Sequence, residues 1–402
     1  MPLFAWAPPR WWDWASIAAL TAGLTGLCLP VRWRRVSAAA VACGFALQFL
    51  ADQHRLQPWA WQFFILAVVI ALADDRLVFR GWMALVISIY FWSALSKLDA
   101  EFAREMVWMI FRQLSDTLIA IRAYGLYSAI SDIDLIRSFR PIGYAVGIVE
   151  ITIAFALATR RFRTSGYWGS VFMHTGLITL LGPWGLGHQP GVLVWNALFM
   201  VQNTVLFRGS TISLFDQRSV PEISHGFRDR WRTTTVTGFL AFVLCWPALE
   251  PWGRCDAWLG WAVYVPRFHG FKIWVDTAGL ERLPESYRQN KENQFNGFFC
   301  LGQGKEDREW QLFVGAVSLD ELGVPIYPNH RFTVGVALDL QERYGANEMD
   351  VDLWTRADRW TLYREDADSF VTRAQLEAYA RTFRVNALPE SVLRRQAEER
   401  TR

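Results

Sequence analysis

Residues 79–97 read FRGWMALVISIYFWSALSK, and this stretch decides the class of fold. Its charged side chains, Arg80 and Lys97, stand close to its two ends, and the residues between them are uncharged and mostly apolar. A helix needs roughly 20 predominantly apolar residues to cross the hydrocarbon core of a bilayer. The stretch therefore predicts a membrane-spanning helix that carries an ionisable amine at one end.

Further apolar segments of similar length occupy the first two thirds of the chain. With the stretch above, the predicted spans are residues 13–31, 36–51, 58–73, 79–97, 142–159, 167–187, 191–207 and 234–253. A single short apolar segment can equally be a buried core helix. A succession of them favours an α-helical integral membrane bundle of about eight spans, whose principal partner is the lipid bilayer.

The composition of the whole chain agrees with a membrane protein and excludes several other classes. Of 402 residues, 52% are apolar, 20% are charged and 22 are tryptophan. This abundance of aromatic residues excludes a disordered chain, and five cysteines are too few for a disulfide scaffold. A net charge of +3, spread along the chain, argues against nucleic-acid binding.

Two segments are predicted to lie at the membrane interface. Residues 104–128 mix apolar residues with charged ones, which predicts an interfacial or re-entrant helix rather than a span. The charged residues in question are Arg104, Arg112, Asp116 and Arg122. Near the start of the chain, Trp11, Trp12 and Trp14 predict an interfacial anchor rather than a cleaved signal peptide.

The distribution of arginine predicts the orientation of the bundle. Alternate loops between the predicted spans carry 13 basic residues: Arg32, Arg34, Arg35, Arg76, Arg80, Arg160, Arg161, Arg163, Arg208, Arg218, Arg228, Arg230 and Arg232. Cytoplasmic loops of membrane proteins are enriched in Lys and Arg. We therefore expect a multi-pass protein of a bacterial inner (plasma) membrane, with Lys97 and both termini at the outer face.

The composition changes after residue 264 and divides the chain into two predicted domains. Residues 1–264 form the transmembrane helical domain, and residues 265–402 form a polar, extracytoplasmic α+β domain. The predicted strands of the second domain are Phe271–Val275, Trp310–Val317 and Phe332–Leu338, and residues 373–384 are predicted to be helical. This domain offers a surface for a protein partner.

Two further features concern the attachment of the C-terminal domain and the thiols on the predicted outer side. Residues 323–328 contain two prolines and, with Arg331, predict a rigid element that docks the domain onto the membrane half. Cys255 and Cys300 both fall on the predicted outer side, where an oxidising compartment allows a disulfide. Because sequence gives no distance between them, two free thiols remain the alternative.

The segment from Tyr90 to Phe102, YFWSALSKLDAEF, is the most informative for chemistry. It places Lys97 at the end of an apolar helix, and an ionisable residue in a membrane segment is costly enough to indicate function. Burial lowers the pKa of a lysine, so that a neutral amine can act as a base. The alternative is a lysine that reaches the interface and pairs with Asp99 or Glu101.

A second polar cluster is predicted to lie opposite Lys97. His174 lies inside an apolar segment, while Asn196 and Asn203 are seven residues apart on one face of the next segment. These side chains, with Lys97, are the candidate catalytic and binding residues of one pocket. The alternative is interhelical hydrogen bonding that only holds the bundle together. Glu150 is a further intramembrane carboxylate, which could pair with an arginine or relay protons.

The turn before the third predicted span supplies a third set of candidates. His54, Gln57, Trp59 and Gln62 are the candidate cofactor-binding residues there, together with Asn203. Aromatic rings in this region could stack on a quinone, although an interfacial aromatic belt explains them equally. The histidines of the chain lack the spacing of a metal site, so we expect no metal.

Residues 90–102 also resemble a known family. Tyr90, Phe91, Lys97-Leu-Asp-Ala-Glu101 and Phe102 are similar to the corresponding motif of vitamin K-dependent γ-glutamyl carboxylase and its bacterial relatives, the HTTM (horizontally transferred transmembrane domain) family. The resemblance implies a multi-span core followed by an extracytoplasmic domain. It also implies that Lys97 is the base that deprotonates a reduced, vitamin K-like quinone, and it makes His54 the candidate for the family's hydrogen-bonding histidine.

The same residues leave two classes of function open. The first is a membrane enzyme, carboxylase-like or quinone-linked, in which Lys97 takes a proton from a hydroquinone. The segment is also similar to the shorter DoxX- and MauE-like proteins, which are associated with redox chemistry. The second class is therefore a redox-associated or non-catalytic membrane assembly protein, whose C-terminal domain binds a partner.

Overall fold

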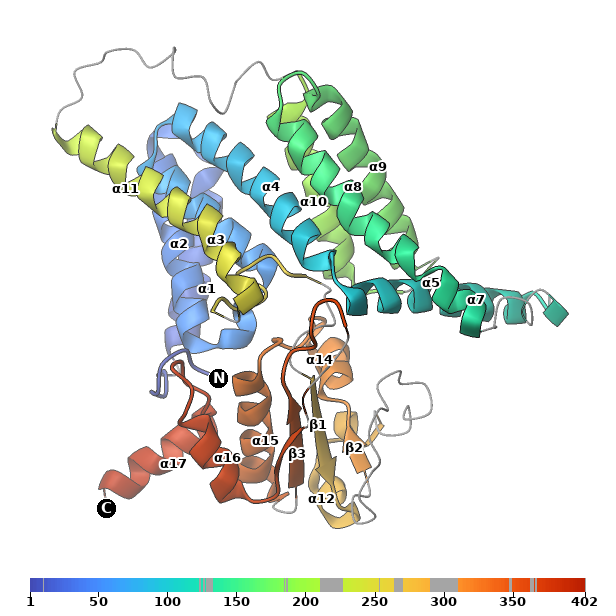
Figure 1. The fold of residues 1–402 in the computed structure, drawn as a ribbon. Helices are drawn as coiled ribbons and strands as arrows, with labels where there is room; N and C mark the ends of the chain where they lie inside the picture. Colours follow the sequence, from blue (N-terminus) through green and yellow to red (C-terminus); the bar gives the residue numbers. More distant parts are fainter. Residues whose placement is uncertain are drawn as a thin grey trace.

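The computed structural model describes residues 1–9, 11–122, 124–125, 127, 133–183, 185, 187–209, 227–252, 254–263, 270–289, 310–346, 349–361, 365 and 367–401. Two bodies make up this part of the chain: a bundle of long helices, and a small mixed domain at one end of the bundle (Figure 1). Cys300 and the expected domain boundary at residue 264 lie outside the described residues.

Each predicted span corresponds to a helix. The helices are α1 (Trp11–Leu27), α2 (Arg34–Ala51), α3 (Pro58–Leu72), α4 (Asp75–Lys97), α8 (Arg140–Ala158), α9 (Arg163–Leu181), α10 (Pro190–Phe207) and α11 (Phe227–Cys245). In Figure 1, α1, α2 and α3 stand together, α8, α9 and α10 form a second group, α4 lies between the two groups, and α11 crosses in front of the first. The buried apolar side chains of α4 meet those of α3, α8, α10 and α11 in one core. Helix α4 is therefore the central element of the bundle.

Four helices among the described residues are long and apolar enough to cross a membrane. They are Asp75–Lys97, Arg140–Ala158, Pro190–Phe207 and Trp231–Trp252. The chain is thus a helical membrane protein on the evidence of these four segments. The predicted count of about eight spans is not supported by length and composition, because the other four helices are shorter or more polar. Helices α1 and α3, for example, have 17 and 15 residues.

Helix α5 (Ala100–Ala120) behaves differently from the bundle helices. It runs crosswise to them at the end that meets the small domain and projects past α8, with α7 (Ile133–Ser138) beside it (Figure 1). Its orientation fits the predicted interfacial helix. The turn starts at Asp99, whose carboxylate accepts hydrogen bonds from the backbone N–H groups of Glu101 and Phe102.

The remaining elements are short. The 3₁₀ helices are η1 (Val31–Trp33), η2 (Gln53–Arg55) and η3 (Trp246–Trp252). The C-terminal domain contains β1 (Gly270–Val275), α12 (Thr277–Arg282), α13 (Glu285–Gln289), β2 (Trp310–Leu312), α14 (Val314–Leu322), α15 (His330–Tyr344), β3 (Met349–Trp354), β4 (Asp368–Phe370), α16 (Arg373–Ala380) and α17 (Glu390–Thr401). Its strands form an antiparallel sheet in the order β2-β1-β3-β4.

Two of the three predicted strands needed correction. The strand predicted at Phe271–Val275 is β1, but Trp310–Val317 is a strand only to Leu312 and then becomes helix α14. Phe332–Leu338, predicted as a strand, lies within helix α15. The side chain of Asn329 caps this helix by accepting from the N–H of Arg331, and Gly345 ends it in a left-handed conformation. These end signals outweigh the preference of Val and Phe for strands, because α15 packs its apolar side chains against the sheet.

The small domain contacts the bundle at one of its two ends. The turn between α2 and α3 contacts it through His54, the segment after α4 contacts it through Ala100, and η3 contacts it through Glu250. Because successive helices of the bundle are antiparallel, the arginine-bearing turns after α1, α3 and α8 lie at the opposite end. The Lys97 end of α4 and the C-terminal domain therefore share one side of the bundle.

Candidate functional site

Helix α4 carries the central polar side chains of the bundle. Tyr90, Ser93 and Lys97 are separated by three and four residues, so they follow one face of the helix. Tyr90 is 3% exposed and Lys97 is 7% exposed, although both belong to a helix apolar enough to span a membrane. This face is the part of the bundle that can hold chemistry.

Lys97 forms a buried ion pair with Glu150 of α8. Its Nζ lies 2.7 Å from both Oε1 and Oε2 of Glu150 and 2.6 Å from Ser93 Oγ. Glu150 is 5% exposed, so both charges are withdrawn from solvent. The three contacts match the three donors of an ammonium group. The expected arginine partner of Glu150 was therefore wrong, as was the alternative pairing of Lys97 with Asp99 or Glu101.

Two glycines of α8 allow the backbones to come close enough for this pair. A Cβ atom on Gly147 would stand 3.0 Å from Ala94 O of α4, and one on Gly143 would stand 2.4 Å from Ala103 O of α5. Gly143, Gly147 and Glu150 follow one another at helical spacing, and Gly147 and Glu150 both face the C-terminal end of α4. Small residues of this kind bring membrane helices together. The sequence thus supplies both the acid and the close packing that delivers it to Lys97.

A hydrogen-bonded chain lies next to the ion pair. The Tyr90 hydroxyl is 2.6 Å from His174 Nε2, and His174 Nδ1 is 2.7 Å from Asn196 Oδ1. Since an amide oxygen can only accept, Nδ1 carries a proton, and the Tyr90 hydroxyl donates to Nε2. Asn203 Nδ2 in turn donates to the Tyr90 oxygen at 2.7 Å and to Ser170 Oγ at 3.1 Å. The structure therefore brings together His174, Asn196 and Asn203, as predicted.

Lys97 and Tyr90 both belong to helix α4, but among the described residues no hydrogen bond joins Lys97 to the Tyr90–His174–Asn196 chain. The rings of His174 and Phe199 stack with centroids 5.0 Å apart, which shields the chain on that side. The site thus has two separate parts, a Lys97–Glu150 ion pair and a neutral Tyr90–His174–Asn196 chain, both built on helix α4.

A second group of polar side chains, centred on two glutamines, joins α3, α4 and α10. Gln62 Nε2 donates to Gln202 Oε1 at 3.0 Å, and the indoles of Trp82 and Trp195 donate to Gln202 Oε1 and Gln62 Oε1. Trp59 is 39% exposed and has no place in this cluster among the described residues. Among those residues, Gln202 Nε2 and Asn203 Oδ1 are buried amide atoms without a hydrogen-bond partner.

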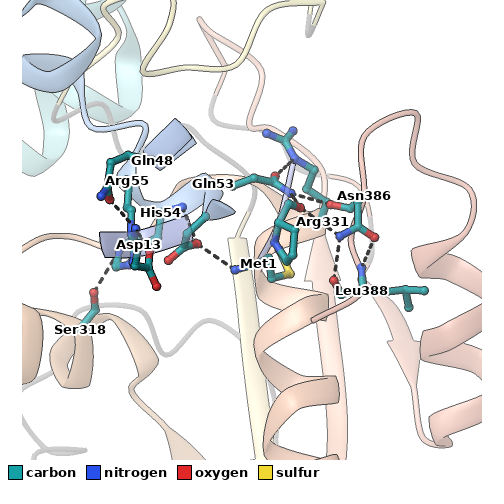
Figure 2. A network of polar contacts seen from close by, with 12 residues as sticks. Met1, Asp13, Gln48, Gln53, His54, Arg55, Ser318, Arg331, Asn386 and Leu388 are labelled. Carbon is teal, nitrogen blue, oxygen red and sulfur yellow. Dashed lines mark hydrogen bonds and ion pairs between the residues drawn. The ribbon is translucent and has the colours of Figure 1, made fainter. Parts of the chain in front are cut away.

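His54 and Gln57 lie elsewhere, at the junction with the C-terminal domain. His54 Nε2 is 2.9 Å from Pro325 O and 3.3 Å from Ser318 Oγ, and its ring contacts Phe332 with centroids 5.1 Å apart. Gln57 Nε2 donates to His54 O. Figure 2 shows His54 and Ser318 within the polar network at this junction. The structure therefore separates these two candidates from Lys97 and places them in the docking contact.

The other half of the same junction is built around Asp256. The guanidinium of Arg331 binds both oxygens of Asp256, while its Nε donates to Gln53 Oε1 at 2.6 Å. The Tyr327 hydroxyl and the Asn329 amide also donate to Asp256, at 2.7 and 3.0 Å. Figure 2 shows Gln53 between Arg331 and Asn386. These contacts agree with the prediction that residues 323–328 and Arg331 dock the domain.

The pKa of His54 provides a test of the docking contact. Burial lowers this pKa below the usual 6.5, with opposing effects from Pro325 O and Asp52. The folded state therefore prefers the neutral ring, and stability should fall as the pH drops below 6.5, where the unfolded chain binds a proton first. We expect the midpoint of thermal unfolding to decrease between pH 7.5 and 5, and His54→Gln to remove part of this decrease. At pH 8 the His54 ring is neutral in both the folded and the unfolded wild type. A comparison of wild type and His54→Gln at that pH therefore measures the lost hydrogen bond alone. An identical pH profile for His54→Gln would contradict the expectation.

Cys255 bears on the predicted disulfide. Among the described residues its thiol has no disulfide partner, it is 3% exposed, and it lies 3.4 Å from the Asp256 carbonyl oxygen. The predicted partner, Cys300, lies outside those residues, so the disulfide remains a prediction. Burial raises its pKa to about 12, so it is an unreactive thiol at neutral pH.

Comparison of the chain with family models, with curated proteins and with solved structures found no significant match. The fold and the site alone define the class: a helical membrane protein with a small extramembrane α+β domain and a buried polar cluster on its central helix. Sequence reasoning named Lys97, His174, Asn196 and Asn203 of this cluster but gave no role to Tyr90 beyond the family motif. The spacing of Tyr90 and Lys97, seven residues apart on one helix face, was the signal that could have linked them.

Proposed function

We propose that this chain is a membrane-embedded enzyme, carboxylase-like or quinone-linked, that transfers protons to and from a quinone-type, lipid-soluble molecule at the Lys97–Glu150 pair. The single observation that carries the proposal is that a lysine and a glutamate lie together, buried, between apolar helices. Such a pair is costly in a membrane and is characteristic of proton-handling sites. The similarity of residues 90–102 to the vitamin K-dependent carboxylase motif points to the same chemistry.

The geometry permits a balanced proton transfer. A proton moves from the Lys97 ammonium to the Glu150 carboxylate across their 2.7 Å contact and leaves a neutral amine. This amine accepts the proton of a hydroquinone hydroxyl, which becomes the anion. The unpartnered Asn203 Oδ1 can accept a hydrogen bond from the second hydroxyl of the hydroquinone.

We infer the membrane arrangement from the same helices. All eight long helices cross a bacterial inner membrane, because antiparallel neighbours of similar length share one bundle. The arginine-bearing turns face the cytoplasm, and the C-terminal domain, together with Lys97, faces the outside. There the domain offers its surface to a protein partner.

A second candidate is a redox-associated or non-catalytic assembly protein of the DoxX or MauE kind. The observation that favours it is that the Lys97 ammonium already has hydrogen-bond partners within the protein, because it donates to Ser93 and Glu150. Interhelical hydrogen bonds of this sort can serve only to hold a bundle together.

Quinone binding separates the two candidates. The protein is purified in detergent and titrated with reduced vitamin K, and bound quinone is extracted and quantified. We expect binding in the wild type and at least a tenfold loss in the double variant Lys97→Met/Glu150→Leu, which removes both charges together and so preserves folding. Thr175→Val, on an exposed face of α9, is the matched control and should bind normally. If the wild type binds no quinone, or the double variant binds as well as the wild type, the enzyme proposal is wrong.

A further inference from the structure

A groove runs along α4 on the side away from the polar cluster. It has a volume of about 610 Å³ and is lined by residues of α4, α8 and α11. Pockets for small ligands have volumes of roughly 300–1,000 Å³. Its walls are apolar except for Arg80 and Ser88. Lys97, His174 and Asn196 do not line it, so the groove is separate from the candidate proton-transfer site.

The groove opens toward the lipid. Phe155 of α8 lines it and is 60% exposed, in the middle of a helix that is apolar enough to span the membrane. In a bilayer such a side chain faces acyl chains rather than water. A molecule can therefore enter the groove sideways from the membrane.

The groove is longer than the hydrocarbon part of one leaflet. It extends along α4 from Leu77 to Trp92, and a helix rises 1.5 Å per residue, which gives roughly 22 Å. One leaflet contributes about half of the 30 Å hydrocarbon core. The groove can thus take an extended acyl chain from the headgroup level to the middle of the bilayer or slightly beyond.

The headgroup end of the groove is basic. Arg80 lines it there, and the adjoining turn between α3 and α4 is held by two further arginines. Arg35 donates to Ala73 O at 3.3 Å, and Arg232 donates to Ala71 O at 3.4 Å. Guanidinium groups bind phosphate oxygens with strong, often bidentate hydrogen bonds. The positive charge at this end complements a lipid phosphate.

We propose that this groove binds an anionic phospholipid, with an acyl chain along α4 and the phosphate at Arg80. The neutral side chains beyond Ala84 accommodate the chain, and the arginines select the charge of the headgroup. The proposal rests on the membrane character of the helices and does not depend on hydroquinone chemistry at Lys97.

Lipid retention tests the proposal directly. The full-length protein is delipidated in detergent and incubated with phosphatidylglycerol or with phosphatidylcholine of the same acyl chains, and bound lipid is counted by native mass spectrometry. We expect phosphatidylglycerol to be retained and to raise the unfolding temperature, and phosphatidylcholine to do neither. Arg80→Gln should reduce phosphatidylglycerol retention about tenfold, in keeping with the loss of a charge-assisted hydrogen bond. Ala84→Phe should block retention by filling the groove.

Matched variants make the outcome decisive. Arg161→Gln removes an arginine of the same bundle end that does not line the groove, and it should leave retention unchanged. Cooperative unfolding of each variant shows that it is folded. Equal retention of the two lipids, or no effect of Arg80→Gln, would overturn the proposal. Retention of reduced vitamin K that is lost in Ser88→Ala but not in Arg80→Gln would also overturn it, because the groove would then hold a quinone.

Discussion

Removal of one member of the Lys97–Glu150 pair is expected to lower the free energy of unfolding by about 3–5 kcal/mol, because the other charge is left buried without a partner. Lys97→Met and Glu150→Leu are the variants to compare, since each replaces the charged side chain by an apolar one of similar length. The two residues are 7% and 5% exposed, so solvent cannot compensate the remaining charge.

The double variant Lys97→Met/Glu150→Leu should recover most of this loss, because no buried charge remains. Chemical unfolding in detergent, followed by tryptophan fluorescence, measures all three variants in one cycle. The exposed pair of Arg137 and Asp134 serves as control, and Arg137→Met should change stability by less than about 1 kcal/mol. Single variants as stable as the wild type would show that the buried pair does not form.

Loss of Arg331 is expected to undock the C-terminal domain from the bundle. Arg331 is 5% exposed and binds Asp256 and Gln53 at once, so Arg331→Met leaves a carboxylate that is only 22% exposed without its cation, and an amide oxygen without its donor. A cost of about 1.5–3 kcal/mol follows for the docked state. Burial alone would raise the pKa of Asp256, but hydrogen bonds from Arg331 and Tyr327 hold it below its usual value. The contact is therefore complete at neutral pH and weakens only in acid.

Limited proteolysis reports this undocking. We expect Arg331→Met to release the C-terminal domain under conditions in which the wild type stays intact, and Asp256→Asn to act in the same direction. Arg343 pairs with Asp339 on the surface of the same helix, so Arg343→Met is the matched control and should not change cleavage. Wild-type cleavage kinetics in Arg331→Met would mean that the domain is held by apolar contacts alone.

Much of the fold was predictable because it depends on local composition. A run of apolar residues becomes a helix in a membrane, since only a helix satisfies every backbone hydrogen bond within the segment. The helix α15 was not predictable in the same way. Its Val and Phe residues favour a strand, and the caps at Asn329 and Gly345 decide the outcome together with packing against the sheet.

The site was predictable only in part, because local patterns place residues on a helix face but do not determine contacts between distant segments. His174, Asn196 and Asn203 could be grouped because two neighbouring helices and helical spacing bring them together. His54 could not be placed, because its partner Pro325 is 271 positions away in the chain. A contact of that range depends on how the C-terminal domain seats on the bundle, which no local pattern encodes.

The sequence by itself determined a helical membrane bundle, a polar C-terminal domain and a lysine at the end of the central span, since hydropathy and helical periodicity are properties of short segments. Only the tertiary structure decided that Glu150 is the partner of Lys97 and that His54 belongs to the docking contact. The physical reason is that a buried charge or polar group takes the partner that close packing brings within hydrogen-bond reach. Here the glycines of α8 determine that partner for Lys97, by letting two backbones approach.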